Sequence, residues 1–329
     1  MRRLAAVVVA GVLTGAVVPG CATEENPGDP LQVAATLEPA RPAVSPAQSS
    51  DLPGVVAPVG RASSVVVAGG RVAVAVTDPP SVVGFPLDAL SSGAPSSEPL
   101  VVALPGPAER LVAAGGAVEA VVPAGAVVTV RPDGSSSSRE VPGGPVDVVS
   151  VGGRTLVAQR EAGQVVAGDH AVTGISSPDR LVAVGDRAVV LDRPRSAVFD
   201  LDPSADRPGA GLRAGEGATN AVADRFGRVF VVDTRGGELM AFSANPVLMR
   251  LRYPLPGAPY GMAYDAGRDL LWVTLTERNE VVGFDVSGGE PVERHRHATV
   301  GQPDSVAVDP GSGRVFVASG SGQGMQVIG

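Results

Sequence analysis

The sequence predicts an all-β protein, a propeller of seven blades with four antiparallel strands each. After residue 54, Val/Ala-rich runs of four to six residues alternate with Gly, Pro and Asp, and no helical periodicity is evident. Similar segments recur at steps of 46, 37, 33, 41, 42 and 44 residues, and about 40 residues is the length of one four-stranded blade. The short third step leaves six blades as the alternative.

The first 20 residues have the pattern of a secretory leader. Met1-Arg2-Arg3 precedes an uncharged apolar run of about 15 residues, which is short for a membrane span. The next residues, Val18-Pro19-Gly20-Cys21, resemble a bacterial lipobox. That resemblance implies cleavage before Cys21, lipidation of its thiol, and anchoring with acyl chains such as palmitate on the extracytoplasmic side of the cell membrane. The alternative is an ordinary signal peptide with a chance cysteine.

Residues 21–53 are expected to form a disordered tether that carries the lipidated cysteine. Six prolines between Pro27 and Pro53 are incompatible with a regular helix or a sheet strand. At about 5–6 Å × √n, such a chain would hold a domain roughly 30 Å from the membrane. The predicted organisation is therefore a signal peptide over 1–20, a tether over 21–53 and one propeller over 54–329.

The clearest repeats lie in the last three units, where an aliphatic strand, a turn and a second strand follow one another. The paired segments are Asn220–Asp224 with Gly227–Val232, Pro259–Asp265 with Leu270–Thr274, and Pro303–Asp309 with Gly313–Ala318. The motif Pro-x-x-Val-Ala-Val-Asp followed by Gly-Arg-Val-Phe-Val-Ala resembles the YVTN/NHL-type β-propeller repeat. The resemblance covers roughly residues 54–329, and it is looser in the first four units.

Closure of the ring is predicted from the chain ends. The last unit ends at Ile328-Gly329 after only three strands. An aliphatic segment, Val55-Val56-Ala57-Pro58, stands directly before the first unit. We expect residues 55–58 to add the missing outer strand, because two sheet edges would otherwise stay open.

Composition excludes several classes of function. All 26 cationic residues are arginine, which removes Schiff-base lysines and phosphate-loop lysines. The single cysteine excludes a four-thiolate metal site, and three histidines leave little room for a zinc site or a Ser/His/Asp triad. A net charge of −8 argues against nucleic acid as a partner. No catalytic motif is evident.

The candidate binding site is the mouth of the central channel. In propellers of this type, the loop before each innermost strand and the loop between the second and third strands share that face. The first set of loops supplies Glu109, Arg110, Asp179, Arg180, Asn220, Tyr260 and Asp304. The second set includes Arg160, Arg193, Arg235 and Asn279. We interpret these residues as a polar mouth for a ligand or a protein partner, although turns are polar for other reasons too.

An enzyme is the alternative interpretation. Glu109, Asp179, Asn220 and Asp304 carry oxygen ligands of the kind that hold Ca²⁺, as in gluconolactonase-like propellers. A metal-dependent lactonase, a hydrolase or a lyase-like enzyme would use such carboxylates at the channel mouth. No other cofactor and no dedicated metal site is expected.

Six arginines recur at the turn between the first and second strands, which should lie on the opposite face. They are Arg71, Arg154, Arg187, Arg228, Arg268 and Arg314. Two interpretations are open: local pairing with carboxylates such as Asp224, Asp265 and Asp309, or docking to anionic headgroups and envelope polymers. His295 and His297 alternate on one predicted outer strand, so a shared metal is the alternative to a solvated edge.

The sequence therefore predicts a lipid-anchored, monomeric, extracytoplasmic propeller that binds or scaffolds. Its expected partners are the membrane, through the anchor, and an envelope protein or polymer that the sequence does not identify.

Overall fold

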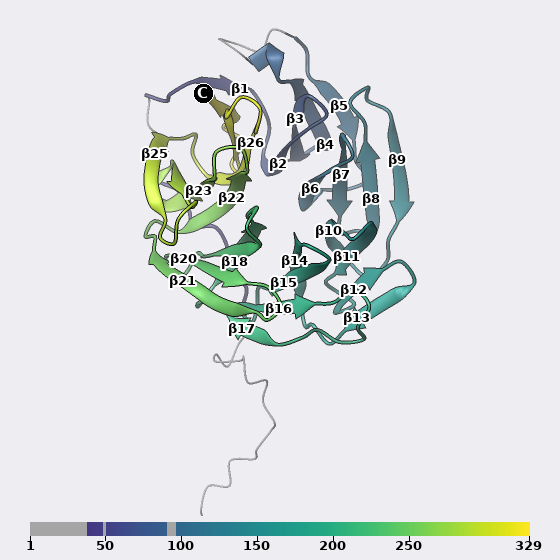
Figure 1. The fold of residues 1–329 in the computed structure, drawn as a ribbon. Coiled ribbons are helices and arrows are strands. Elements are labelled where there is room, and N and C mark those ends of the chain that lie inside the picture. Colours follow the sequence, from purple (N-terminus) through teal and green to yellow (C-terminus); the bar gives the residue numbers. More distant parts are fainter. Residues whose placement is uncertain (1–37, 49–50, 91–96) are drawn as a thin grey trace, which may run out of the picture.

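Seven four-stranded antiparallel sheets surround a central channel in the computed structural model, which describes residues 38–48, 51–90 and 97–329 (Figure 1). The seven-bladed prediction is confirmed, and the six-bladed alternative is wrong. The predicted leader and Cys21 lie outside the described residues. Within the described part of the chain, no helix is long and apolar enough to cross a membrane.

The first four blades follow one another along the chain, each running from an innermost to an outermost strand. Blade 1 contains β2 (Ala62–Ala68), β3 (Arg71–Thr77), β4 (Pro80–Pro86), the 3₁₀ turn η1 (Asp88–Leu90) and β5 (Leu100–Ala103). Blade 2 contains β6 (Arg110–Ala114), β7 (Ala117–Val122), β8 (Ala126–Val130) and β9 (Ser136–Glu140). Blade 3 contains β10 (Pro145–Val151), β11 (Arg154–Gln159), β12 (Gln164–Ala167) and β13 (His170–Thr173). Blade 4 contains β14 (Pro178–Val184), β15 (Arg187–Asp192), β16 (Ala197–Leu201) and β17 (Gly211–Arg213).

The last three blades repeat this order, and the seventh takes its outer strand from the start of the domain. Blade 5 contains β18 (Ala218–Ala223), β19 (Arg228–Asp233), β20 (Glu238–Ser243) and β21 (Leu248–Pro254). Blade 6 contains β22 (Pro259–Asp265), β23 (Leu270–Leu275), η2 (Thr276–Arg278), β24 (Glu280–Asp285) and β25 (Val292–Ala298). Blade 7 contains β26 (Pro303–Val308), β27 (Val315–Ser319), β28 (Met325–Ile328) and β1 (Val55–Ala57).

The ring closes where β1 pairs antiparallel with β28, with Val55 opposite Val327 and Ala57 opposite Met325. This confirms the predicted closing strand, which ends at Ala57. Gly54 precedes it at φ +78°, and a Cβ there would lie 1.9 Å from the Val327 carbonyl oxygen. Only glycine fits that approach. The pairing covers the free edge of β28 with backbone hydrogen bonds.

The core is divided among the blade-to-blade contacts. Seven hydrophobic clusters are present among the described residues, and each combines side chains from two neighbouring blades. The contact between blades 5 and 6 includes Phe230 and Phe284, whereas the buried cluster between blades 2 and 3 consists of five valines. Each blade therefore buries both of its faces against its neighbours.

Turn chemistry changes along the ring. The first-to-second-strand hairpins of blades 1 to 3 have Gly-Gly turns with positive φ at both residues, such as Gly69 at 56° and Gly70 at 73°. Two consecutive positive φ values are typical of the type I′ turn, which glycine adopts without strain. The equivalent loops of blades 5 to 7 are closed by an aspartate; Asp224, for example, accepts hydrogen bonds from the amides of Phe226 and Arg228.

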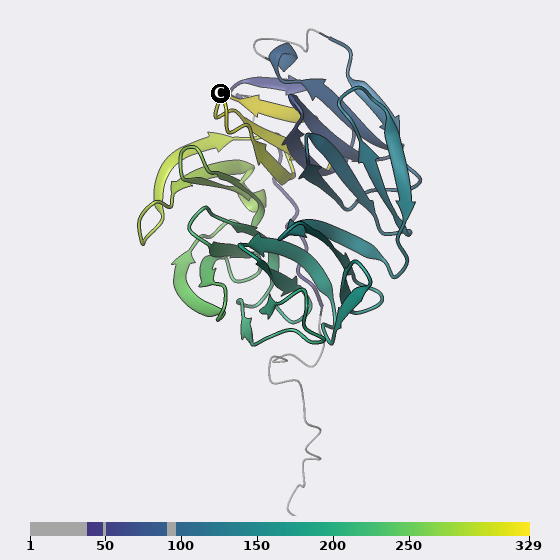
Figure 2. The same cartoon turned by 45° about the vertical axis from the view of Figure 1, so that its right-hand side comes forward.

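Residues 38–48 lie against the channel-mouth face and form a segment that we call the strap. The sequence places them in a disordered tether; they have no regular secondary structure, yet they contact blades 4 to 7. Figure 2 shows the strap, in purple, passing behind the ring from its lower edge. The difference arises because an extended proline-containing chain keeps its carbonyl oxygens free to accept hydrogen bonds from side chains.

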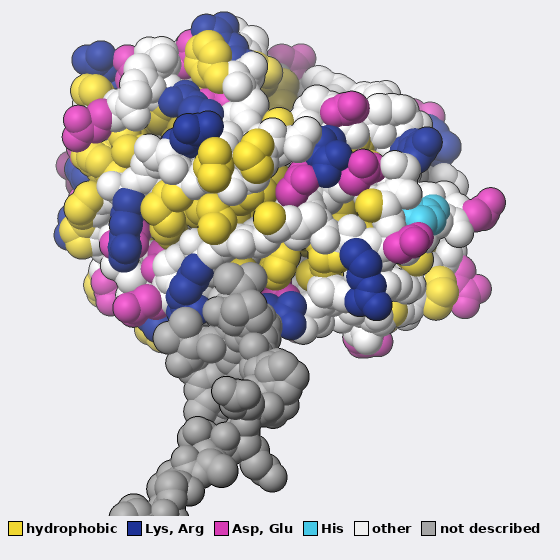
Figure 3. Space-filling view, turned by 60° about the horizontal axis from the view of Figure 1, so that its bottom comes forward, with side chains coloured by type: hydrophobic (Ala, Val, Ile, Leu, Met, Phe, Trp, Pro, Cys, Tyr) yellow, Lys and Arg dark blue, Asp and Glu magenta, His cyan; other side chains and the backbone are white. Residues whose placement is uncertain are grey.

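The rim of the ring consists of outer strands and is largely exposed. On β21, Leu248 and Met249 are 43% and 44% exposed, next to Arg250 and Arg252. Figure 3 shows hydrophobic side chains gathered beside arginines on this side of the molecule. Leu248 and Met249 therefore lie on the rim, away from the channel.

Candidate functional site at the channel mouth

A β-bulge marks the channel mouth in six of the seven innermost strands. The register shifts next to the first residue of β2, β10, β14, β18, β22 and β26. The register shift skips the second position of each strand, which holds residues such as Asp179 and Asp304, and in β22 it skips the third position as well. Bulges of this kind change the direction of a side chain, so the second and third positions come to face the channel mouth and the next blade.

The third positions of the six bulged strands, together with Arg110 at the start of β6, form a ring that links neighbouring blades, which we call the girdle. Its members are Ser64, Arg110, Asp147, Arg180, Asn220, Gly261 and Ser305. The Ser64 hydroxyl accepts a hydrogen bond from the Leu111 amide, and Asp147 accepts one from the Leu181 amide. Arg110 pairs with Asp147 at 2.9 Å. The girdle therefore holds blades 1 to 4 in order through side chains.

The remaining girdle members continue the chain of contacts around the ring. Arg180 donates to Asn220, and the Asn220 amide donates to the Tyr260 carbonyl at 2.9 Å. Ser305 accepts from the Val65 amide at 2.9 Å, which joins blade 7 to blade 1. A Cβ at Gly261 would lie 3.2 Å from the Asp304 carbonyl oxygen, so a glycine permits the close approach of blades 6 and 7.

Arg160 joins three blades at the mouth. Its guanidinium donates to both carboxylate oxygens of Glu109 in blade 2, and through Nε to Asp179 Oδ1 in blade 4 at 2.7 Å. Arg180 adds a contact of 3.8 Å to Glu109. Burial raises the pKa of the Glu109 carboxyl, but Arg160, Arg180 and Arg193 outweigh burial and hold that pKa below its usual value.

The mouth opens into a cavity of about 410 Å³ that extends along the channel. Six of the seven residues predicted for the mouth line it: Glu109, Arg110, Arg180, Asn220, Tyr260 and Asp304. The seventh, Asp179, is 3% exposed and supports Arg160 from behind. Each innermost strand is the end strand of its sheet, so backbone N–H and C=O groups without a neighbouring strand also face the channel.

Asp304 is the carboxylate in the cavity that is held without an arginine. Its Oδ1 accepts a hydrogen bond from Gln302 Nε2 at 3.0 Å. Burial raises the pKa of Asp304 to about 7, and the hydrogen bond from Gln302 only partly opposes this. At neutral pH this carboxyl is therefore divided between its acid and its carboxylate forms.

The four oxygen-bearing residues considered for Ca²⁺ are not gathered around one point. Glu109 and Asp179 meet at the guanidinium of Arg160, Asn220 accepts from Arg180, and Asp304 contacts Gln302. Among the described residues, no group of three or more His, Cys, Asp or Glu side chains is placed to hold a metal ion. A thermal-shift titration with Ca²⁺ tests this hypothesis directly.

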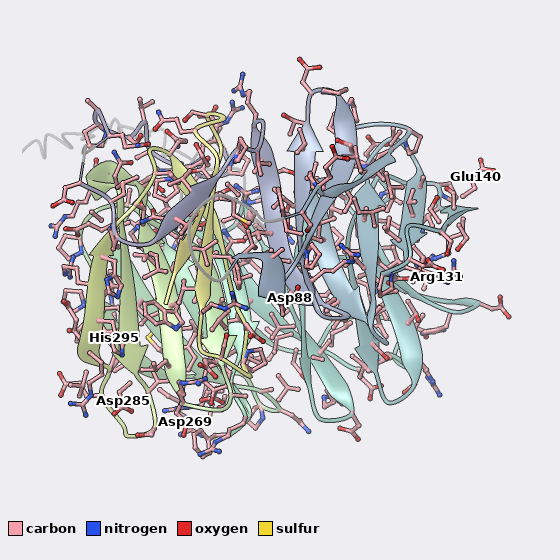
Figure 4. The ribbon with its side chains drawn as sticks, turned by 90° about the horizontal axis from the view of Figure 1, so that it is seen from above. Asp88, Arg131, Glu140, Asp269, Asp285 and His295 are labelled. Atoms are coloured by element: carbon pink, nitrogen blue, oxygen red, sulfur yellow. The ribbon has the colours of Figure 1, made fainter. Side chains whose placement is uncertain are left out.

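On the opposite face, most of the six recurrent arginines have partners close in sequence. Arg228 pairs with Asp224 at 2.6 Å, Arg268 with Asp265 at 3.0 Å, and Arg187 with Asp200 and Asp202. Arg71 donates to the Pro132 carbonyl, Arg314 Nε donates to the Ser312 hydroxyl, and Arg154 is exposed. Figure 4 shows this face at its lower edge, where Asp269 and Asp285 are labelled. The local-pairing interpretation describes Arg187, Arg228 and Arg268.

His295 and His297 lie on β25, which is the outer strand of blade 6, as predicted. Both imidazoles stack with Trp272, at centroid distances of 5.4 Å and 6.2 Å. The pair therefore packs on the indole ring. Burial, and then the neighbouring His295, lower the pKa of His297 and favour its neutral form.

Sequence reasoning missed four girdle members: Ser64, Asp147, Gly261 and Ser305. A signal was present, because a Pro or Ala stands two positions before each girdle residue. When the seven units are aligned on that Pro or Ala, rather than on their second strands, the seven girdle residues fall at the same position.

No family model matches the sequence, and no curated protein matches it at the significance required. Solved structures do resemble the fold. A catalytically inactive virginiamycin B lyase from Staphylococcus aureus, with quinupristin, is 13% identical over 82% of this chain and 94% of its own, with a TM-score of 0.65. A Kuenenia stuttgartiensis hydrazine synthase chain is 14% identical over 86% and 97%, and a mitotic checkpoint complex chain is 12% identical over 99% and 98%, each with a TM-score of 0.66. At these identities the likeness shows that the chain has a β-propeller fold.

Proposed function

We propose that this chain is a lipid-anchored, extracytoplasmic binding protein with YVTN/NHL-type repeats, and that the channel mouth is its ligand site. The observation that supports this most directly is the cavity of about 410 Å³, which combines side chains from six blades. A volume of that size fits a small molecule or a single group of a larger partner. Its lining includes the guanidiniums of Arg110, Arg180 and Arg193 and the amide of Asn220. These polar groups provide orientation and specificity.

The strap supports a defined orientation on the membrane. Glu38 contacts Arg235 on the mouth face, and Cys21 stands 17 residues earlier in the sequence. At no more than about 3.6 Å per residue, those residues reach about 60 Å. The described chain therefore begins on the mouth side, and in this proposal the mouth faces the anchoring membrane while the arginine hairpins face away from it.

Binding is favoured over catalysis by the state of the acidic groups. An acid–base role needs a carboxyl that is free to exchange a proton near the working pH. Glu109 and Asp179 are both held by Arg160. Asp304 is the exception, because its pKa of about 7 suits proton transfer. That one residue supports a lyase-like or hydrolytic enzyme as the second candidate.

Native mass spectrometry of the purified protein, after incubation with a low-molecular-weight envelope extract, tests the binding site. Ser63→Tyr should fill the mouth, because the equivalent position of blade 6 already holds Tyr260. Val101→Tyr is the matched control on the outer strand of the same blade, where Val101 is 61% exposed. We expect a bound mass that persists in Val101→Tyr and disappears in Ser63→Tyr. Equal retention in both variants contradicts the proposed site.

The anchor is tested separately by incorporation of radiolabelled palmitate. Label should enter the wild-type protein and be absent from Cys21→Ala. Labelling of Cys21→Ala at the wild-type level would show that the lipobox assignment is wrong.

A further inference from the structure

Arg193 differs from the other arginines of the mouth. Arg110 and Arg160 each contact a carboxylate at 2.9 Å or less, and Arg180 lies 3.8 Å from Glu109. Arg193 Nη2 donates instead to a neutral acceptor, the backbone carbonyl of Ala40 in the strap, at 2.6 Å. Its Nε is buried and has no hydrogen-bond partner among the described residues. Among the described residues, Arg193 therefore has no carboxylate in direct contact with its guanidinium.

The donor of Arg193 without a partner is Nε, which lies on the same edge of the guanidinium as Nη2, the nitrogen that contacts the strap. In arginine, Nε and Nη2 point their hydrogens in parallel, and this fork matches the two oxygens of a carboxylate or a phosphate. The Ala40 carbonyl supplies only one oxygen, to Nη2. An oxyanion in the same place would satisfy both donors and neutralise the charge.

The surroundings of Arg193 favour a small, polar anion. The side chain lines the cavity together with Arg180 and Asn220, and its charge acts on Glu109. Glu109 and Asp179 are occupied by Arg160, and the Asp179 carboxylate also accepts the Arg193 amide. Burial raises the pKa of Asp304, across the cavity, to about 7, so this carboxyl opposes an anion less than an ordinary aspartate would.

We propose that the channel mouth binds a small oxyanion, a carboxylate or a phosphate, on the Nε and Nη2 edge of Arg193, and that this ligand replaces the Ala40 carbonyl and releases the strap there. The inference rests on the proposed function and names the ligand class and the regulation of that site. Release is local, because Gln302 holds the strap through Ala43 and Ser45, and Asn279 holds it through Pro46.

The strap and the ligand therefore compete for one donor pair. Contacts beyond Ala40 keep the released segment close to the mouth, so that it can return when the ligand leaves. Ala40 is 4% exposed and packs beside Gly217, where an added Cβ would lie 2.7 Å from the Ala40 Cβ. When the anion is absent, the strap is thus closely packed against the ring at Gly217.

Isothermal titration of the full chain with citrate, with inorganic phosphate, and with sucrose as the neutral control tests the ligand class. Citrate and phosphate distinguish the two kinds of oxyanion. We expect saturable binding of at least one anion and none of sucrose. Arg193→Ser should weaken anion binding about ten- to a hundredfold, the effect of losing charge-assisted hydrogen bonds.

The matched control is Arg235→Ser, because Arg235 contacts the strap at Glu38 but does not line the cavity. Loosening the strap there should leave anion affinity unchanged or increase it. Weaker binding in Arg235→Ser, equal to that of Arg193→Ser, overturns the assignment of Arg193 as the anion-binding residue.

Strap release is measured with a spin label at Arg41→Cys in a Cys21→Ser background. Arg41 is exposed and stands next to Ala40, so the label reports on the part of the strap that is released. The label should become more mobile on addition of the anion that binds, with no change in the Arg193→Ser variant. Saturable binding with unchanged label mobility overturns the exchange.

These outcomes separate this inference from the proposed function. A neutral ligand that is retained by native mass spectrometry and lost in Ser63→Tyr keeps the site and rejects the oxyanion class. Absence of any saturable citrate or phosphate binding to the wild-type chain likewise rejects it.

Discussion

The two faces of the propeller use the same residue types in opposite ways. At the mouth, Arg160 contacts Glu109, 51 residues earlier, and Asp179, 19 residues later, and so connects three blades. On the hairpin face, Arg228 and Arg268 pair with aspartates only four and three residues away. Arginines of the mouth join carboxylates of different blades and face a cavity, whereas those of the hairpins pair with an aspartate of their own turn and reach the next blade only through backbone carbonyls, such as Val286 from Arg228 and Pro310 from Arg268.

The comparison shows how a repeat acquires a site. All seven blades share the same strand order, but the positions at the mouth end of the inner strands have diverged into Glu109, Arg110, Asp147, Asp179 and Arg180 on adjacent blades. In blades 3 and 4, β-bulges direct these positions toward the channel and the neighbouring blade. Different residues at equivalent positions therefore form one mixed-charge network, while the hairpin loops keep a local Asp–Arg pairing.

The largest expected effect comes from Asp147→Ala. Asp147 is 1% exposed, accepts the Leu181 amide of the next blade, and pairs with Arg110. Its removal leaves a partly buried guanidinium without its carboxylate and a buried amide without its acceptor, so we expect a loss of about 3 kcal/mol or more in the free energy of unfolding. Urea unfolding followed by tryptophan fluorescence measures it. A loss below about 1 kcal/mol would contradict the girdle as a structural element.

Arg160→Met should cost about 2–3 kcal/mol, because it leaves two carboxylates without their cation at a partly exposed position. Its pH dependence has a definite sign. The lowered pKa of Glu109 contributes stability above the unfolded pKa of about 4.3, and this contribution is lost as the pH falls through the folded value. The difference between wild type and variant should therefore be large at pH 7 and shrink below pH 4. A difference independent of pH argues against this ion pair.

Asp304→Asn should stabilise the protein at alkaline pH. The folded pKa of about 7 lies above the unfolded value of about 3.9, so the native state binds the extra proton and loses stability as the pH rises between these values. The amide keeps an oxygen that can accept from Gln302 and carries no charge. We expect a Tm about 2–3 °C above wild type at pH 8 and no difference at pH 4. A lower Tm at pH 8 contradicts the predicted burial cost.

The smallest effect is expected on the hairpin face. Arg268 is 40% exposed, pairs with Asp265 three residues away, and donates to the exposed Pro310 carbonyl at 3.1 Å, so Arg268→Ser should change the free energy of unfolding by about 0–1 kcal/mol. The same urea experiment measures it beside Arg160→Met. A loss as large as that of Arg160→Met would remove the distinction between the two faces.

Much of the fold follows from the sequence because its signals are local and repeated. The Val/Ala strands, the Gly-Gly turns and the spacing of about 40 residues predict the blades, and residues 55–58 are predicted as the closing strand, which the structure has as Val55–Ala57. Six of the seven predicted mouth residues line the cavity, because loops at equivalent places in a propeller share a face. Asp147 and Ser305 were missed, because polar residues are common where a strand follows a turn and nothing else in the sequence sets these two apart.

The strap was beyond sequence reasoning for a physical reason. A proline-containing segment has no periodic pattern, and its position depends on donors far along the chain, such as Arg193, Asn279 and Gln302. The local sequence contains the acceptors, whereas the donors belong to loops that only the closed ring brings together.

The sequence alone determined the all-β class, the seven repeats and the closing strand, and it predicts the leader and its lipidated Cys21. These depend on patterns within a few residues or on a regular period. Only the tertiary structure decided which charges meet: Arg160 between Glu109 and Asp179, Arg180 on Asn220, and Arg193 on the strap. Ion pairs form between side chains that the ring brings within a few ångströms, and that distance is fixed by closure and bulge geometry rather than by spacing along the chain.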